Sequence, residues 1–174
     1  MKVSTTKLTT RYYETDQMGI IHHSNYYRYF EVARTDYLKD IIGMTYKDIE
    51  NAGVRMPLTE THCKYKTPAL YDDEITITTS VREMTVVRII FDYVITREKD
   101  GALIAEGATA HAFTNFENRP INLKKFANDL YQQLFSAANT DILEKYNKNV
   151  KKHYSEFLET QLIWAKIMGR TSYY

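Results

Sequence analysis

The chain contains few of the residues that cross-link a protein or interrupt its regular structure. Among its 174 residues are one cysteine, three prolines and six glycines. The single cysteine, Cys63, excludes an internal disulfide and a zinc cluster built on cysteines, and it fits a reducing compartment. Because Cys63 lies in a strand-like run, we interpret it as a buried structural thiol. The scarcity of proline and glycine indicates long regular elements.

An excess of charge of either sign is also absent. Lysine and arginine number 23 against 22 aspartates and glutamates, which leaves a formal net charge of +1. Nucleic-acid-binding domains usually carry a strong basic excess, so this balance argues against a nucleic-acid partner. No apolar run approaches the roughly 18 residues of a transmembrane helix, and the first residues lack the apolar core of a signal peptide. We therefore predict a soluble cytoplasmic protein without a transmembrane segment.

The hydrophobic residues, 44% of the chain, suffice for the core of one domain and follow clear periods. Alternation predicts a strand over residues 3–16, and apolar residues three and four apart predict a helix over about 25–42, with a shorter helical piece near 45–52. Four further strands are predicted to form a meander, over residues 54–67, 75–81, 87–95 and 102–115. One long helix and one antiparallel sheet indicate an α+β fold, with the helix packed on one face of the sheet.

From about Leu123 onward the pattern becomes helical. A first set of apolar residues keeps a helical spacing as far as Ala138. A second apolar stripe comprises Phe157, Leu158, Trp164 and Met168. We predict a domain over residues 1–123, followed by a helical extension over residues 124–174 that packs on its own domain or on a partner subunit.

The densest group of polar residues lies where the first strand gives way to the long helix. Asp16 precedes a helix start near Ser24 or Asn25, where free backbone N–H groups carry partial positive charge. Such groups can hold a developing oxyanion while a nearby carboxylate acts as nucleophile or general base. The alternative is that Asp16 only satisfies the amides of its own loop. The residue pattern by itself leaves both interpretations open.

Other kinds of site find little support in the sequence. His22 and His23 beside Asp16 do not indicate a metal site, because adjacent side chains point in different directions. The remaining histidines are scattered along the chain at His62, His111 and His153. The motifs of a serine nucleophile elbow, a phosphate-binding loop and a dinucleotide-binding turn are all absent. We therefore predict a site with neither a metal nor a cofactor.

The run RYYETDQMGIIHHSNYYRYFEVARTDYL, from Arg11 to Leu38, resembles the signature of the 4-hydroxybenzoyl-CoA thioesterase family of hotdog-fold proteins. The shared pattern is an aspartate, a glycine, small and apolar residues, a histidine or aromatic residue, an Asn-Tyr pair and a helix carrying Glu-x-x-Arg. The segment YKTPALYDDEI at 65–75 resembles the second block of the family, and Arg119-Pro120 resembles its end. The resemblance covers about residues 5–123.

This resemblance implies a five-stranded antiparallel sheet wrapped around the long helix, dimers formed by pairing two sheets, and acyl-CoA thioesters bound at the subunit interface. Asp16 matches the catalytic aspartate of the family. His23 matches the position whose backbone N–H polarises the thioester carbonyl. Asn25 and Tyr26 match the pair that shapes the entry to the helix. His22 departs from the apolar or aromatic residue that is common there, so the pattern leaves open which histidine faces the site.

We therefore expect an acyl-CoA thioesterase that uses no cofactor and forms a homodimer or homotetramer. The alternatives are an acyl-carrier-protein thioesterase, a hotdog hydratase and a non-catalytic acyl-CoA-binding module. Hydratases of this fold usually place the histidine closer to the aspartate than the seven-residue step found here. The phosphates and adenine of CoA require basic residues near the mouth of the site, and Lys66, Arg88 and Arg119 are candidates by charge and position.

Overall fold

The computed structural model of the chain describes residues 2–138. Its strands are β1 (Val3–Thr9), β2 (Leu58–Tyr65), β3 (Glu74–Met84), β4 (Arg88–Arg97) and β5 (Leu103–Ala112). Its α-helices are α1 (Asn25–Tyr37), α2 (Tyr46–Asn51) and α3 (Leu123–Phe126), and residues 128–138 are also helical. A 3-10 helix, η1 (Tyr12–Glu14), precedes α1, and a π-helical turn, η2 (Leu38–Ile42), follows it.

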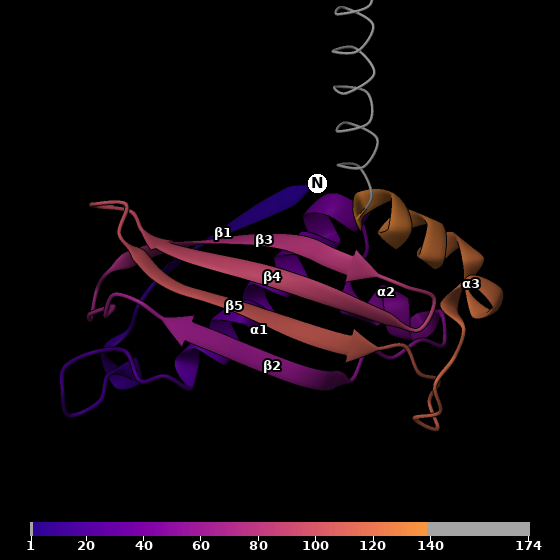
Figure 1. Ribbon diagram of the computed structural model, residues 1–174, viewed down its shortest axis with the longest axis horizontal. Helices are drawn as coiled ribbons and strands as arrows, with labels where there is room; N and C mark the ends of the chain where they lie inside the picture. Colours follow the sequence, from indigo (N-terminus) through magenta and orange to yellow (C-terminus); the bar gives the residue numbers. More distant parts are fainter. Residues whose placement is uncertain (1, 139–174) are drawn as a thin grey trace, which may run out of the picture. The chain divides into compact units, whose positions relative to one another are not determined.

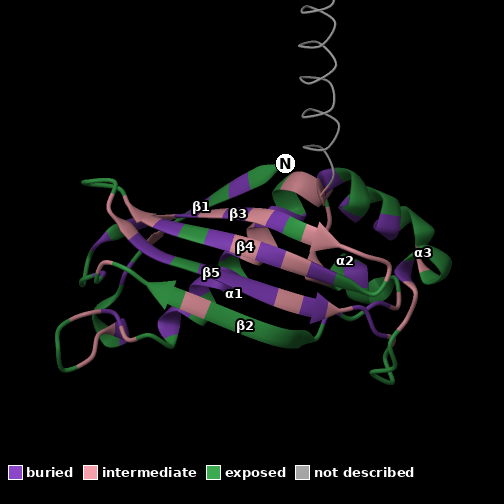
Figure 2. Cartoon of the chain, viewed as in Figure 1, coloured by how far each residue is buried: buried purple, intermediate pink, exposed green. Residues whose placement is uncertain are grey.

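The five strands form one antiparallel sheet, and α1 lies across one of its faces (Figure 1). The strand order is β1-β3-β4-β5-β2, and every neighbouring pair is antiparallel. Alternate residues of β3 and β4 are buried while their neighbours are more exposed, which Figure 2 shows as stripes along the strands. The predicted α+β class, with a five-stranded antiparallel sheet around a long helix, is therefore confirmed.

The predicted meander is wrong for its first strand. Strands β3, β4 and β5 follow one another in the sheet, but β2 pairs with β5, so that Cys63 lies opposite Gly107 at the edge far from β1. A tight hairpin would have placed β2 beside β3. The chain leaving β2 instead crosses the end of the sheet. There Thr10 N donates to Asp73 O at 3.0 Å, and this hydrogen bond joins the end of β1 to the start of β3, its neighbour in the sheet.

The first strand is also shorter than predicted. β1 ends at Thr9, and the residues that continue the alternation form η1 and a loop. The hydroxyl of Thr10 donates to Leu70 O at 2.6 Å and accepts from Asp73 N at 2.9 Å. Side-chain hydrogen bonds of this kind compete with a strand ladder, so the strand stops here. The helix predicted over 25–42 is confirmed as α1 followed by η2, with Gly43 after its end at a φ of 75°.

Aromatic packing holds α1 on the sheet. The ring of Phe30 stacks on that of Tyr93 with the ring centroids 4.4 Å apart. This approach requires a glycine on β5, because a Cβ on Gly107 would lie 2.8 Å from the His62 carbonyl oxygen and closer still to the Phe30 ring. Overpacking at such a point typically costs ~1–3 kcal/mol. Gly107 therefore sets how closely the helix approaches the sheet.

The residues after β5 contribute to the same core. Leu123, Leu130 and Leu134 are buried, in a compact unit that extends to Ala138. The second apolar stripe, with Phe157 and Trp164, lies outside the described residues, and the domain boundary after residue 123 stays a prediction. Among residues 2–138, no helix is both long enough and apolar enough to cross a membrane.

A buried histidine lies near the end of β5. His111 is 1% exposed; its Nδ1 is 3.0 Å from Met56 O and its Nε2 is 3.0 Å from Thr109 Oγ1. The same Thr109 hydroxyl is 2.8 Å from Tyr93 Oη. Burial, assisted by the positive charge of Arg34, lowers the pKa of His111 to about 4. The folded protein therefore keeps this imidazole neutral at pH values where an unfolded chain would protonate it.

We expect His111 to make the fold sensitive to mild acid. Its pKa falls from 6.5 to about 4 on folding, so the unfolded state binds a proton first as the pH drops. The free energy of unfolding lost between pH 7 and pH 4 through this residue is roughly 3 kcal/mol, at about 1.4 kcal/mol per pKa unit. Urea unfolding of the wild type and of His111→Gln at pH 7 and pH 4 measures the loss that is due to this residue. An equal pH dependence of the two proteins would contradict the prediction.

Candidate active site

The predicted site lies in the loop between β1 and α1, at the end of the sheet where β2 ends and β3 begins (Figure 1). The loop closes on itself, since Asp16 N donates to Ile20 O and Gly19 N donates to Asp16 O, each at 2.9 Å. A bridge between Thr15 and Ile21 joins its two arms. Gly19 has a φ of 75°, in the left-handed region that favours glycine. The loop is therefore a tight, internally bonded support for Asp16.

The Asp16 carboxylate uses only one of its oxygens to stabilise this loop. Oδ1 accepts a hydrogen bond from Met18 N at 2.8 Å. Oδ2 has no hydrogen-bond partner among residues 2–138, and the side chain is half-buried. The two interpretations of Asp16 are thus compatible, because one oxygen holds the turn while the other remains available to a ligand.

The three residues directly before α1, His22 to Ser24, include one uncommitted backbone donor. His22 N donates to Glu14 O at 2.9 Å, Asn25 N to His22 O at 3.0 Å, and Tyr26 N to His23 O at 3.3 Å. In the described part of the chain, the N–H of His23 makes no hydrogen bond. It lies just before the first turn of a 13-residue helix, where unpaired N–H groups carry partial positive charge. Such a donor can bind a carbonyl oxygen or an anion.

Asp16 and His23 line the same cavity, which has a volume of about 280 Å³. Its walls come from the loop, from α1 and from the segment after β2: Asp16, Met18, Ile20, Ile21, His23, Tyr26, Tyr65, Lys66, Thr67 and Pro68. The predicted residues Asp16, His23, Tyr26 and Lys66 are therefore brought together. Asn25 is buried beside them, where its Nδ2 donates to Glu14 O at 2.9 Å and ties the helix to the loop.

The two adjacent histidines differ in their surroundings. Nδ1 of His22 lies 2.9 Å from Ser24 Oγ, and its ring packs on that of His23 with centroids 4.0 Å apart. Only His23 lines the cavity within residues 2–138. Of the two histidines, His23 is therefore the one that a ligand of Asp16 would meet.

Tyr65 is a cavity residue that the sequence did not single out. Its hydroxyl donates to His23 O at 3.3 Å, and its ring meets that of Tyr26 edge-on with centroids 5.0 Å apart. Burial raises the pKa of Tyr26 to about 12 and also raises the pKa of Tyr65, so both hydroxyls keep their protons at neutral pH. The sequence feature that could have identified Tyr65 as a site residue is its position at the start of the block at 65–75.

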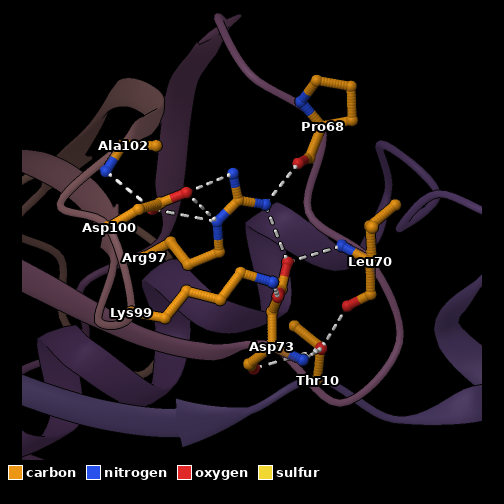
Figure 3. Close-up of polar contacts among 8 residues, drawn as sticks. All are labelled: Thr10, Pro68, Leu70, Asp73, Arg97, Lys99, Asp100 and Ala102. Atoms are coloured by element: carbon orange, nitrogen blue, oxygen red, sulfur yellow. Dashed lines mark hydrogen bonds and ion pairs between the residues drawn. The ribbon is translucent and has the colours of Figure 1, made fainter.

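A buried ion pair holds the wall of the cavity that contains Pro68 (Figure 3). The carboxylate of Asp73, 3% exposed, accepts hydrogen bonds from Leu70 N at 2.9 Å, Arg97 Nη1 at 3.0 Å and Lys99 Nζ at 2.7 Å. Arg97 Nη1 also donates to Pro68 O at 3.2 Å. Burial by itself would raise the pKa of Asp73, but the bonds from Lys99, Leu70 N and Arg97 together hold it below its usual value. The carboxylate is therefore ionised, and it fixes the cavity wall.

The three candidate basic residues lie at different ends of the sheet. Lys66 lines the cavity, and its Nζ lies 3.2 Å from a carboxylate oxygen of Glu106. Arg88 begins β4 at the opposite end of the sheet and pairs with Glu83 at 2.7 Å. Arg119 follows β5 and lies at the same end as Arg88. The backbone N–H of Arg119 donates to Asn115 Oδ1 at 2.9 Å. The structure therefore brings Lys66, but neither arginine, to the cavity of its own chain.

The described residues contain no group of three or more histidine, cysteine, aspartate or glutamate side chains arranged to hold a metal ion. Cys63, on β2, is free and half-buried and packs against the core. Burial raises the pKa of its thiol, so the thiol is not activated as a nucleophile. Asp16 and His23 offer the cavity a carboxylate oxygen and a backbone donor, beside the polar side chains of Tyr26, Tyr65, Lys66 and Thr67.

Comparisons with known proteins agree with this architecture. The model of the thioesterase-like superfamily matches residues 10–144. An Aquifex aeolicus protein whose name proposes an esterase is 36% identical over 101 residues, which are 58% of this chain and 77% of that protein. A Bacillus subtilis protein whose name proposes an acyl-CoA thioesterase is 33% identical over 126 residues, or 72% of this chain and 90% of its own length.

Among solved structures, a DHNA-CoA thioesterase from Staphylococcus aureus superimposes with a TM-score of 0.74 at 32% identity. The superposition covers 86% of this chain and 96% of that one. The hotdog fold expected from the sequence is thereby confirmed. The comparisons identify the broad superfamily, and the narrower 4-hydroxybenzoyl-CoA thioesterase family remains a resemblance of the motif.

We expect the two aspartates that bind Arg97 to differ greatly in their effect on stability. Asp73→Asn removes the charge from a buried pair and should lower the free energy of unfolding by ~3–5 kcal/mol. Asp100 binds the same guanidinium at 3.0 Å but is 45% exposed, so Asp100→Asn should cost only ~0–1 kcal/mol. Urea unfolding at pH 7 compares the matched variants. Similar losses for both would show that Asp73 does not anchor this end of the sheet.

Proposed function

The chain belongs to the thioesterase-like superfamily of thioester hydrolases, and we propose that it hydrolyses an acyl-CoA thioester in the cavity that contains Asp16 and His23. One observation carries this proposal. A carboxylate oxygen without a protein partner and a backbone N–H without a protein acceptor, among the residues described, belong to two residues of one cavity. These are the two groups that attack on a polarised carbonyl requires.

The proposed reaction places the thioester carbonyl oxygen on the His23 N–H. This donor, together with the helix terminus, stabilises the negative charge that develops on the oxygen during attack. Asp16 then acts in one of two ways. It attacks the carbonyl carbon, the C–S bond breaks to release CoA as a thiolate, and water then hydrolyses the acyl-aspartate to the free acid. Alternatively, it takes a proton from a water that attacks the carbonyl carbon, and the C–S bond breaks as the CoA thiolate leaves and takes up that proton. A thioester is activated enough for this pair to act without a cofactor.

Lys66 is the proposed contact for a CoA phosphate. It lines the cavity, and its partner Glu106 is 48% exposed, so the ion pair can open when a phosphate competes for the ammonium group. The acyl group would lie against the rings of Tyr26 and Tyr65. These two aromatic rings would suit an aromatic or short acyl group.

We also propose that two chains complete the site. β2 is an edge strand, and seven of its eight residues are exposed, which leaves unpaired backbone groups and a template for pairing with another strand. The cavity begins where this strand ends, at Tyr65 and Lys66. Pairing through β2 would place a second chain beside the cavity. Arg88 and Arg119, which lie far from the cavity of their own chain, would then act only on that of a partner.

Asp16→Asn should abolish most thioesterase activity, because an amide is neither a nucleophile nor a base. Loss of an acid–base group typically lowers kcat by ~10²–10⁴-fold. The amide oxygen can still accept the bond from Met18 N, so the fold should be kept. His23→Ala should cost much less, because alanine retains the backbone N–H. Release of free CoA thiol from a panel of aromatic and aliphatic acyl-CoAs measures the activity of both variants.

The results for these two variants and for the substrate panel distinguish the possible functions of the cavity. A folded His23→Ala variant as inactive as Asp16→Asn would show that the imidazole itself transfers protons. Binding of acyl-CoA without turnover of any substrate in the panel would indicate a non-catalytic binding module. Turnover of acyl-carrier-protein thioesters but not of acyl-CoA would identify the other thioesterase class. Near-normal turnover by Asp16→Asn would refute its assignment.

Light scattering should show a mass at least twice the 20.5 kDa of one chain, because the exposed strand β2 needs a partner. A homotetramer is also compatible with the proposal. The activity per chain should fall on dilution below the dissociation constant of the dimer, since the site would lose its second wall. A monomer that retains full activity when diluted would refute the shared site.

A further inference from the structure

A buried glutamate lies beside the proposed site without lining its cavity. Glu14, the last residue of η1, is 7% exposed. Its Oε2 accepts two hydrogen bonds, from the Arg11 backbone N–H at 2.7 Å and from the Tyr29 hydroxyl at 2.8 Å. A carboxyl group buried in this way is costly unless it is hydrogen-bonded. The two donors on one oxygen therefore fix where the side chain of Glu14 can lie.

The backbone of the same residue binds the far arm of the loop and the start of the helix. The carbonyl oxygen of Glu14 accepts from His22 N and from Asn25 Nδ2, each at 2.9 Å. Asn25 and Tyr29 are four residues apart and lie on one face of α1. Glu14 thus receives bonds from two successive turns of the helix and from the residue directly before His23.

These contacts connect Glu14 to both proposed reacting groups. Asp16 is two residues after Glu14 on one arm of the loop, and His23 follows the residue that Glu14 binds on the other arm. A shift of Glu14 would therefore move the carboxylate and the N–H relative to each other. Misplacement of reacting groups by 1 Å can cost 10²-fold in rate, by the usual order of magnitude.

We propose that Glu14, held by Tyr29, is a positioning residue that sets the separation between the Asp16 carboxylate and the His23 N–H. This inference rests on the proposed thioesterase function. Neither Glu14 nor Tyr29 lines the cavity of Asp16; both instead line a separate cavity of about 210 Å³. Burial, with the bond to Glu14, raises the pKa of Tyr29, so its hydroxyl stays a donor throughout the working pH range.

The test compares two buried tyrosines of α1. Tyr29→Phe removes the hydroxyl that holds Glu14, whereas Tyr37→Phe removes a hydroxyl that has no partner within the described residues. We expect kcat for acyl-CoA hydrolysis to fall about tenfold in Tyr29→Phe, a partial misplacement, with KM changed less than about twofold because the cavity wall is intact. Tyr37→Phe should keep the kcat and KM of the wild type.

Rescue by a conservative variant completes the test. In Glu14→Gln the amide oxygen can accept both hydrogen bonds, so kcat should stay close to that of the wild type. Glu14→Ala loses both bonds and should lose at least as much activity as Tyr29→Phe. If Glu14→Ala does not fold, the two tyrosine variants and Glu14→Gln still decide the question.

The outcomes separate this inference from the proposed function. An inactive wild type, or an active Asp16→Asn, overturns both. An active wild type with an inactive Asp16→Asn and an unchanged Tyr29→Phe overturns only the positioning role of Glu14. A loss in Tyr29→Phe that appears in KM instead of kcat, or that Tyr37→Phe shares, also overturns it, because a general effect on packing would then explain the result.

Discussion

The site depends on how α1 packs against the inner face of the sheet. Phe30 lies against the strand at Gly107 and stacks on Tyr93, so the helix sits at a fixed depth and a fixed position along the strands. Because the helix is fixed, its N-terminal end is fixed as well, beside the end of β2 and the segment Lys66–Pro68. A larger residue at position 107 would displace the helix and with it the donor at His23. Packing far from the cavity thus determines the geometry inside it.

At the same end of the sheet, polar contacts replace apolar packing. The turn before β3 is held by Asp73 and Thr10, and Ile21 N donates to Ala69 O at 2.8 Å. The cavity wall is therefore bonded to the loop of Asp16 on one side and to the ion pair with Arg97 on the other. Irregular backbone at the margin of a domain is usually mobile. Here each irregular segment has a buried side chain that holds it, which keeps the site in one arrangement.

Most elements predicted from local pattern agree with the structure; the errors are the length of the first strand, which stops at Thr9, and the pairing of β2. Helix α1 and strands β3, β4 and β5 follow the period of their apolar residues. Asp16, His23 and Tyr26 were found through the motif in the block at 11–38, and Lys66 was proposed from its charge and position. The position of β2 was missed because its exposed residues carry no apolar alternation, and nothing local distinguishes pairing with β5 from pairing with β3. Asp73 and Arg97 escaped notice for a similar reason, since 24 residues separate them and an ion pair leaves no periodic signal.

Three carboxylates near this end of the sheet differ in their hydrogen bonds, and this difference suits them to the different roles that we propose for them. Asp73 receives three donors, two of them cationic, and Glu14 receives two donors on one oxygen. These bonds hold both side chains in place, and neither residue lines the cavity of Asp16. Asp16 receives one donor and is half-buried, so it keeps an oxygen that can approach a carbonyl carbon. Of the three, Asp16 alone lines the cavity that also contains His23, so its unbonded oxygen is the one that the proposed thioester would meet.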